Sequence, residues 1–384
     1  MKVVFVSAFL NHHQIPLCEE LRELSDEFYF ISTEDTSNVG YQKQGSADYV
    51  LQYFDKSQNN VILQKLAEAD IVIFGACPAE LIEYRMSQNK LSFIYAERYF
   101  KKGIWRRLIP STRKTIKRKI INHSDKKLYV LAASAYLSYD LSLLGFSHER
   151  CFKWGYFPKI ERYKNIGNIL DVKDKGSILW CGRMIKLKHP EHAIKMAKRL
   201  RNRGYAFELN MIGDGPLKEK MQQLVDRLNL SDCVHILGSK SHDEVRVYME
   251  KSQIFVFTSN RMEGWGAVVN EAMNGGCCVI ASHAVGSVPF LIENGGTGEV
   301  YKSGSVKDLT EKVALLLNDN ARMRAIGERA YNSLVSEWNA TDAAKRLITL
   351  ATYLLISENA PSYKTGPCSN APIIKDDWYK EKGV

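Results

Sequence analysis

The sequence predicts an α/β protein with two domains, each built on a parallel sheet with helices on both faces. Strand-like apolar runs alternate with helix-like stretches in both halves of the chain, which is the order of βαβ units. The length of 384 residues is too large for one ordinary domain and comfortable for two. The composition, 45% hydrophobic and 25% charged, is that of a globular protein with buried cores.

The first domain is predicted at residues 1–158. The run Val3 to Ala8 is the first strand, and the helix after it begins at Pro16, since proline is tolerated in the first turn of a helix. The later apolar runs predict strands at 28–31, 71–74, 91–95 and 128–131, and helices at 79–87 and 135–144. Strands joined in this way form a parallel, doubly wound sheet.

The second domain is predicted at residues 177–338. Residues 159–176 are polar without clear periodicity, so they are interpreted as a linker. The strands expected beyond it are 178–181, 206–212, 233–236 and 254–257, alternating with helices at 190–203, 217–229 and 243–250. Two amphipathic helices are expected at 309–317 and 323–335. A loosely held tail is expected at residues 358–384. This order implies two Rossmann-like domains facing each other across a cleft.

Residues 259–281 read SNRMEGWGAVVNEAMNGGCCVIA and contain two carboxylates, Glu263 and Glu271. An apolar run precedes this segment and a second one ends it, which predicts strand, tight glycine loop, helix and strand. The loop opens at the carboxyl edge of the sheet, where ligands bind in open α/β proteins. A helix beginning near Gly266 directs free N–H groups toward an anion such as phosphate. Carboxylates instead accept hydrogen bonds from sugar hydroxyls, so the pattern predicts a phosphate ester that contains a sugar.

This segment resembles the E-x7-E signature of retaining glycosyltransferases with the GT-B fold, in family 4 (glycosyl transferases group 1). The resemblance extends from Ser177 to Leu317. Its other motifs, in the family's order, are Gly182-Arg183 with Lys188, the turn Gly213-Asp214-Gly215-Pro216, the segment 234–238, Ser287-Val288-Pro289 and Gly296-Thr297-Gly298.

The resemblance implies roles for individual residues. Arg183 and Lys188 would hold the donor diphosphate; Lys186 is the alternative lysine, but the family's spacing favours Lys188. Glu271 would bind the ribose hydroxyls and Glu263 the donor sugar, so Glu263, Arg183 and Lys188 are the catalytic candidates. The full set of donor-binding candidates is Gly182, Arg183, Lys188, Gly213, Ile236, Leu237, Glu263, Gly264, Trp265, Gly266 and Glu271. In the resembled fold a last helix, here 339–357, crosses back to the first domain.

Two short motifs are candidates for the acceptor site. His12 and His13 follow the first strand, and Glu97-Arg98 follow the strand at 91–95, so both pairs lie at the ligand edge of the first sheet. The histidines could instead cap the following helix. No catalytic base is assigned, because in retaining enzymes of this kind the leaving phosphate can take the acceptor proton.

The net charge of +10 comes from one segment, since residues 101–127 contain eleven Lys and Arg residues and one acid. Ile116 and Ile120 share one helical face among the cations Lys114, Lys117, Arg118 and Lys119, with Trp105 nearby. Such a helix could lie on an anionic membrane, or its apolar face could join the core. Nucleic acid is not favoured as a partner, because no nucleic-acid-binding module accompanies the charge.

Several motifs are absent from the sequence. It contains no G-x-G-x-x-G after the first strand and no P-loop, which argues against a dehydrogenase and a P-loop kinase. It contains no D-x-D, which agrees with catalysis that needs no metal or other cofactor, with Arg and Lys in the metal's electrostatic role. The eight cysteines are scattered, as expected of reduced core residues. With no apolar run long enough to span a bilayer, the expected location is the cytoplasm, at the inner face of the cell membrane.

The function implied by the resemblance is transfer of a hexose from a nucleotide diphosphate sugar to a hydroxyl of a lipid-linked or polysaccharide acceptor, in bacterial-type surface glycan synthesis. Uridine nucleotides are favoured over guanosine nucleotides as donors. Two alternatives stay open: a sugar-nucleotide epimerase or phosphorylase on the same scaffold, although no cofactor-bearing lysine motif is present, and a non-catalytic, membrane-associated scaffold that binds nucleotide sugars.

Overall fold

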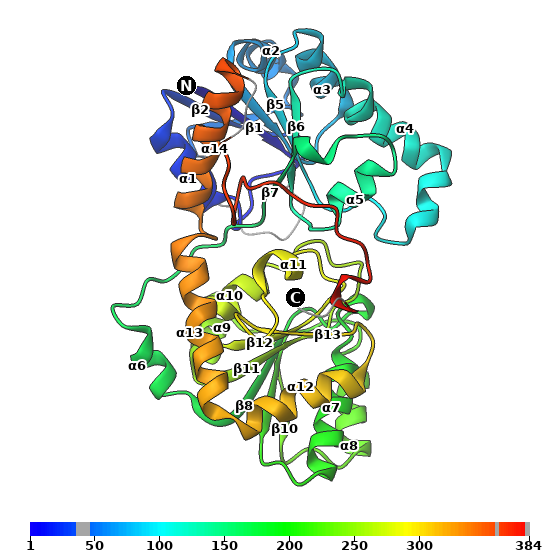
Figure 1. Cartoon of the computed structure of the whole chain (residues 1–384), viewed down its shortest axis with the longest axis vertical. Coiled ribbons are helices and arrows are strands. Elements are labelled where there is room, and N and C mark those ends of the chain that lie inside the picture. The colour runs from blue at the N-terminus through cyan, green and yellow to red at the C-terminus, as the bar shows by residue number, and fades with distance from the viewer. Residues whose placement is uncertain (36–46, 358–360, 381–384) are drawn as a thin grey trace. The chain divides into compact units, whose positions relative to one another are not determined.

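Two sheets, each made only of parallel strands, form the cores of the protein (Figure 1). The computed structural model describes residues 1–35, 47–357 and 361–380. The chain divides into two units, one made of Met1–Lys159 and Trp338–Ile374, the other of Ile160–Glu337 and Lys375–Val384. The predicted α/β class with two parallel sheets is therefore confirmed. The placement of the two domains across a cleft stays a prediction.

Among the described residues, the sheet of the first unit has seven strands in the order β3-β2-β1-β4-β5-β6-β7. Strand β1, an interior strand between β2 and β4, is apolar on both faces, and Val3, Phe5 and Val6 are completely buried, as expected where helices cover both sides of a sheet. The strands are β1 Lys2–Ser7, β2 Glu27–Ser32, β3 Val50–Gln52, β4 Ile71–Phe74, β5 Ser92–Ala96, β6 Leu128–Ala132 and β7 Cys151–Lys153.

Helices connect these strands, and a late helix returns to the first unit. Helix α14 (Ala340–Ile356) packs on α1, and Thr341 donates a hydrogen bond to Glu20 at 2.6 Å. The α-helices before it are α1 Ile15–Leu24, α2 Asn59–Glu68, α3 Ala79–Ser87, α4 Pro110–Lys119 and α5 Leu137–Ser142. Short 3₁₀ turns lie at Lys56–Gln58, Ile104–Leu108, Ile121–His123 and His148–Arg150.

The sheet of the second unit has six strands in the order β10-β9-β8-β11-β12-β13. The first strand of the unit, β8, lies in the middle, between β9 and β11. The strands are β8 Asp174–Cys181, β9 Glu208–Ile212, β10 Val234–Gly238, β11 Ser252–Phe257, β12 Cys278–Ser282 and β13 Glu299–Tyr301.

Helices cover both faces of this sheet, with α7, α8 and α12 in one layer and α6, α9, α10 and α13 in the other (Figure 1). The helices are α6 Ile166–Asp171, α7 Pro190–Asn202, α8 Lys218–Arg227, α9 His242–Lys251, α10 Val268–Asn274, α11 Val288–Leu291, α12 Val306–Asn318 and α13 Asn320–Ser336. Two 3₁₀ turns, η5 Lys186–Lys188 and η6 Trp378–Lys380, complete the unit.

Both sheets reverse their strand order next to their first strand. In one sheet the reversal lies between β1 and β4, and in the other between β8 and β11. The loops that leave such a pair of strands diverge to opposite faces, which leaves room for a ligand at the carboxyl edge. The candidate sites of both units lie at these points.

The structure differs from the expected linker and tail. Residues 160–171 belong to the second unit and include α6, whose Ile166 and Leu170 pack against Tyr331 of α13. The described part of the tail, residues 361–380, is also packed, which corrects the prediction of a loose segment. Cys368 is completely buried, its N–H donates to the carbonyl of Lys153 at 2.8 Å, and Asn370 bridges Phe152 in antiparallel fashion. Polar composition concealed these contacts because they are made mostly by backbone groups.

Candidate functional site

An ion pair between Lys188 and Glu263 lies at the carboxyl edge of the second sheet. The Lys188 ammonium is 2.5 Å from Oε2 of Glu263, and each side chain is 15% exposed. The ammonium also lies 5.2 Å from the centre of the Phe257 ring, a cation–π contact. Of the two candidate lysines, Lys188 is therefore the one that meets the carboxylate of the glycine loop, whereas Lys186 is exposed.

A chain of hydrogen bonds holds Lys188 in this position. The indole N–H of Trp180, in β8, donates to the hydroxyl of Thr258 at 2.8 Å. That hydroxyl donates to the carbonyl of Lys188 at 2.6 Å. Because Thr258 directly follows β11, the two central strands fix the turn that carries the lysine.

His189 and Asn260 connect the same turn to the glycine loop. Oδ1 of Asn260 accepts the N–H of Met262 at 2.9 Å, so Nδ2 is the atom that lies 2.9 Å from Nε2 of His189. Nε2 then accepts, and the ring proton is on Nδ1, which donates to Glu191 at 2.8 Å. His189 adopts the left-handed conformation, with φ of 47°, which directs its ring toward these partners.

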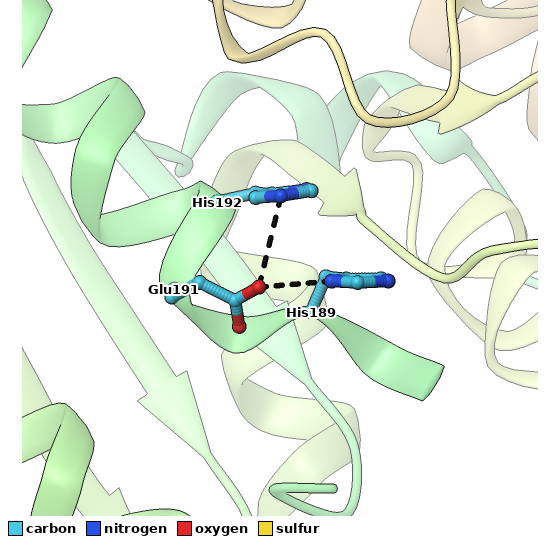
Figure 2. Close-up of side chains that lie close together, drawn as sticks. All are labelled: His189, Glu191 and His192. Atoms are coloured by element: carbon cyan, nitrogen blue, oxygen red, sulfur yellow. Dashed lines mark hydrogen bonds and ion pairs between the residues drawn. The ribbon is translucent and has the colours of Figure 1, made fainter. Parts of the chain in front are cut away.

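His189, Glu191 and His192 have ligand-type atoms within 4.8 Å of one another. Figure 2 shows the Glu191 carboxylate beside two parallel imidazole rings, with one oxygen directed at both, and the ring centres are 4.6 Å apart. Burial lowers the pKa of His192. Burial also acts to raise the pKa of Glu191, but the hydrogen bond from His189 and the charges of the two histidines outweigh burial and lower the pKa of Glu191 below its usual value. A metal on Nδ1 of His189 would require the side-chain amide of Asn260 to rotate by half a turn and to lose the hydrogen bond from the N–H of Met262. The cluster is therefore best explained as a hydrogen-bond network.

The glycine loop is closely packed. A Cβ on Gly266 would lie 2.7 Å from ring atoms of Phe257, and its φ of +83° is rarely adopted by other residues. The Trp265 side chain is buried in the core and donates to Oδ1 of Asn270 at 2.9 Å. Gly264, Trp265 and Gly266 can therefore meet a ligand only through their backbone.

Glu271 lies in α10 with its side chain 13% exposed. Burial raises the pKa of its carboxyl, while the charges of His242 and Arg246 oppose this. Nε2 of His242 is 3.9 Å from the carboxylate. The charges at both ends of the site act on the thiol of Cys181: burial raises its pKa to about 12, the charge of Glu271 adds to the rise and that of Lys188 opposes it.

The two remaining loops of the predicted site run against each other. A Cβ on Gly213 would lie 2.0 Å from the carbonyl oxygen of Gly182, whose N–H donates to Ile212 at 3.0 Å. The backbone therefore presents Arg183, an exposed side chain with no acid within ion-pair distance among the described residues. Ile236 and Leu237 are half buried in β10, beside Gly213, whose N–H donates to Gly238.

A pocket of about 440 Å³ lies at the switch point of the first sheet. Glu97 is central to its wall: the hydroxyl of Tyr156 donates to Oε1 at 2.6 Å, and Lys101 pairs with Oε2. The ring of His13 stacks on Tyr156 at 5.9 Å. Lys119 also lines the pocket and donates to the carbonyl of Cys77 at 2.7 Å.

The four predicted acceptor residues are not equivalent in the structure. His13 and Glu97 line the pocket, whereas His12 is exposed, with its ring centre 3.7 Å from that of His13 and tilted by 48° to it. Arg98 forms part of the wall, but its side chain is fully buried, 3.3 Å from Asp140 and 4.6 Å above the ring of Tyr136. Arg98 is thus better placed to support the wall than to bind an acceptor.

Sequence reasoning missed Tyr156 and Lys101 and gave Lys119 a different role. Tyr156 lies just after β7, far along the chain from Glu97, so only the folded sheet brings them together. Lys101 follows Glu97 at a spacing of four residues, which was a usable signal.

The structure decides between the two arrangements expected for the apolar face of the basic segment. Ile116 and Ile120 are at most 1% exposed, so the apolar face of α4 joins the core and does not face a membrane. Arg118 forms a two-pronged pair with Glu83, at 2.6 and 2.7 Å, and Lys119 belongs to the pocket. Lys114 and Lys117 are exposed, and with Leu108, Pro110, Arg113, Arg118 and Asn122 they line a shallow hollow of about 410 Å³.

None of the helices in the described ranges combines the length and the apolar character that crossing a membrane requires.

Comparisons with known proteins agree with this geometry. Residues 162–333 match the family model of glycosyl transferases group 1. An uncharacterised glycosyltransferase of Methanocaldococcus jannaschii is 36% identical over 122 residues, which are 32% of this chain and 34% of that protein. The amylovoran biosynthesis glycosyltransferase AmsK of Erwinia amylovora is 28% identical over 175 residues, or 44% of this chain and 43% of AmsK. The chain thus spans less than half the length of these curated relatives.

A solved structure shows the same fold over nearly the whole chain. Anabaena HepE, crystallised in complex with UDP, has a TM-score of 0.67 at 14% identity and covers 91% of this chain and 98% of its own. The chain therefore has the two-sheet architecture of GT-B proteins, and its residues 162–333 are similar to the glycosyl transferases group 1 family.

Proposed function

We propose that the protein is a retaining glycosyltransferase that moves a hexose from a UDP sugar to a hydroxyl of a lipid-linked or polysaccharide acceptor. The observation that carries the proposal is the contact between Lys188 and Glu263 at the switch point of the second sheet. It places a cation for a diphosphate beside a carboxylate for a sugar, as a nucleotide sugar requires.

In the structure, Lys188 and Glu263 neutralise each other as an ion pair. A bound donor would give each of them a new partner. A diphosphate between Lys188 and the exposed Arg183 would attract both cations, since charge-assisted hydrogen bonds to phosphate are strong. Glu263 would then be available for sugar hydroxyls. Glu271, in α10, would accept hydrogen bonds from the ribose hydroxyls.

The reaction follows from these positions. The bond between the sugar's anomeric carbon and the distal phosphate oxygen breaks, and its electron pair stays with the leaving diphosphate. Lys188 and Arg183 stabilise the charge that develops there. The acceptor oxygen bonds to the anomeric carbon on the same face, and its proton passes to the leaving phosphate, so that no metal ion or separate base is needed.

The pocket in the first unit is the proposed acceptor site. His13, Glu97 and Tyr156 offer the hydrogen-bonding groups that a sugar needs, and Lys101 and Lys119 add positive charge. This charge suits an acceptor with a phosphate, such as a lipid diphosphate.

The surface next to the pocket supports binding to an anionic membrane face on the cytoplasmic side. Trp105 is 57% exposed and Leu108 is 68% exposed, and Lys114 and Lys117 are exposed beside them. An apolar tip surrounded by cations favours the interface of an anionic bilayer, with about 1 kcal/mol for each cation near the surface. The membrane-facing residues are thus Trp105 and Leu108, and not the isoleucines of α4.

Product analysis tests the activity. The protein is incubated with UDP- and GDP-sugars and with lipid-linked or polysaccharide acceptors. Free UDP together with an extended acceptor supports the proposal. An isomerised donor would indicate the epimerase, and tight binding of the nucleotide sugar without turnover would indicate the scaffold. The fold neighbour HepE, crystallised with UDP, favours uridine donors.

A further inference from the structure

Residues 375–380 contact two loops at the carboxyl edge of the second sheet. Oδ2 of Asp376 is 3.1 Å from the guanidinium of Arg261, in the loop that follows β11. The ring of Tyr379 lies 3.9 Å, centre to centre, from the ring of His283, which directly follows β12. Trp378, between them in sequence, is only 8% exposed.

Arg261 lies inside the turn that presents Glu263. The carbonyl of Asn260 accepts the N–H of Glu263 at 3.0 Å, and its side chain accepts the N–H of Met262 at 2.9 Å. Both hydrogen bonds span Arg261 and close the turn around it. A contact made by the Arg261 side chain therefore also constrains the backbone of Glu263. Asp376 supplies such a contact from a distant part of the sequence.

His283 is itself held firmly. It is 8% exposed, its Nδ1 accepts the N–H of Ser303 at 2.9 Å, and its backbone N–H donates to Tyr301 at 3.0 Å. A ring fixed in this way gives Tyr379 a defined stacking surface. The segment is therefore attached at one end to a rigid loop and at the other to the loop of the donor site.

The preceding residues are also fixed. Ser369 accepts the N–H of Lys153 at 2.7 Å, and Ala371 donates to Cys151 at 2.8 Å, so residues 368–371 extend the edge of β7 in the first unit. The chain then enters the second unit at Lys375. Within the second unit, residues 375–380 are held by their contacts with Arg261 and His283, which suits a positioning element.

We propose that Asp376 and Tyr379 are positioning residues of the donor site, which fix the Glu263 loop and thereby increase affinity for the sugar of a nucleotide diphosphate sugar. This inference rests on the function proposed above. An exposed ion pair contributes little to stability, so the pair of Asp376 with Arg261 serves mainly to orient the loop. Removing it should raise the KM for the donor and leave kcat and binding of free UDP nearly unchanged, because Glu263 contacts the sugar.

The test compares Asp376→Asn with Asp377→Asn. Asp377 is adjacent and exposed, so its substitution removes the same charge without touching Arg261. Asp376→Asn should raise the donor KM about five-fold, the size expected for loss of one charged pair, and Asp376→Glu should restore most of it. Tyr379→Ala should give an increase of the same order. Affinity for UDP and for the UDP sugar is measured alongside by calorimetry.

The outcomes separate the two proposals. If the parent protein binds no nucleotide, the proposed function fails, and this inference fails with it. If the parent binds and turns over the donor but Asp376→Asn and Tyr379→Ala both match Asp377→Asn, only the positioning role is overturned. An equal loss of affinity for UDP and for the UDP sugar would also overturn it, since that result would indicate a general disturbance of the unit.

Discussion

Nδ2 of Asn260 donates a hydrogen bond to Nε2 of His189 at 2.9 Å, and this bond joins the turn of Lys188 to the loop of Glu263. The two residues are 71 positions apart in sequence. The bond therefore ties together the two loops that would hold the two ends of a sugar diphosphate.

Replacing Asn260 by Leu should separate these loops. The variant loses the bond to His189 and the acceptor for the N–H of Met262, at a cost of about 1 kcal/mol for each of these partly buried hydrogen bonds. We expect a lower urea midpoint and weaker binding of the UDP sugar, measured by calorimetry. The matched control is Asn202→Leu, at the exposed end of α7. Asn229 is not used because its φ is positive, so leucine there would add backbone strain. Unchanged donor binding in Asn260→Leu would contradict the role of this bond.

Lys173 should be a determinant of stability and not of binding. Its ammonium donates to the carbonyls of Met249, Glu250, Ser252 and Gly275 at 2.8–3.0 Å, and so caps the ends of α9 and α10. Burial lowers the pKa of this ammonium. Lys173→Met keeps the volume but leaves the carbonyls without their donor, and should cost about 2–4 kcal/mol of unfolding free energy.

Urea unfolding checks this expectation, with Lys175→Met as the control at an exposed position. Equal midpoints for the two variants would show that solvent replaces the ammonium without cost.

Gly213 should tolerate no side chain. Its φ is +137°, and a Cβ would lie 2.0 Å from the carbonyl oxygen of Gly182, so Gly213→Ala must displace the turn that presents Arg183. We expect a loss of at least about 3 kcal/mol together with loss of UDP binding. Gly204→Ala is the control, since its φ of +79° is also left-handed but nothing lies within 4 Å of a Cβ there; it should cost only about 1 kcal/mol. Similar thermal midpoints for the two variants would refute the close approach of the two loops.

Acid should weaken the second unit through His283. Burial lowers the pKa of this histidine from 6.5, while backbone hydrogen bonds at Tyr301 and Asp376 and the charge of Asp376 oppose the shift. A depressed folded-state pKa means that the unfolded chain binds the proton first as pH falls. The stability that neutral His283 provides is therefore fully present above about pH 6.5 and is lost progressively below it.

Thermal midpoints at pH 7.5 and pH 5 measure this effect. The drop between them should be smaller in His283→Gln, which cannot titrate, than in the parent. Burial also lowers the pKa of His123 and His192, so part of the drop remains in the variant. An equal drop in both proteins would remove His283 as a source of the pH dependence.

Local patterns predicted most of the fold and the elements that carry the candidate donor residues. The apolar run of β11, the glycines and the apolar run of β12 gave the strand–loop–helix–strand order around Glu263 and Glu271, because each element is encoded by its own residues. The spacing after Gly182 also favoured Lys188, which is the lysine that meets Glu263. The short strands β3, β7 and β13 have three residues each, too few to produce a recognisable period.

The features that were not predicted depend on long-range contacts. Arg98 looked like a ligand residue because it follows a strand, but its burial depends on Asp140, 42 positions later. Ile116 and Ile120 gave the correct apolar face of α4, although periodicity cannot distinguish a core from a membrane as the partner of that face. The packing of residues 361–380 relies on backbone bonds to β7, for which side chains carry no signal.

Neutralising the exposed cations of α4 tests the membrane proposal. Lys114→Gln with Lys117→Gln should reduce binding to vesicles of anionic lipid about 30-fold, from about 1 kcal/mol for each charge. The control pair Lys220→Gln with Lys307→Gln removes the same charge from exposed sites of the second unit. Vesicle sedimentation at fixed salt compares the two double variants. An equal loss of vesicle binding in both would show that only net charge matters and would contradict the membrane proposal.

The most direct test of the donor site is calorimetric binding of UDP to the parent, to Lys188→Ala and to Lys186→Ala. The two lysines belong to one 3₁₀ turn, and each substitution removes one positive charge. The account predicts that Lys186→Ala binds like the parent and that Lys188→Ala binds about 10–100-fold more weakly, the effect of one charge-assisted hydrogen bond. Equal affinity of Lys188→Ala and the parent, or no binding of UDP to the parent, would contradict it.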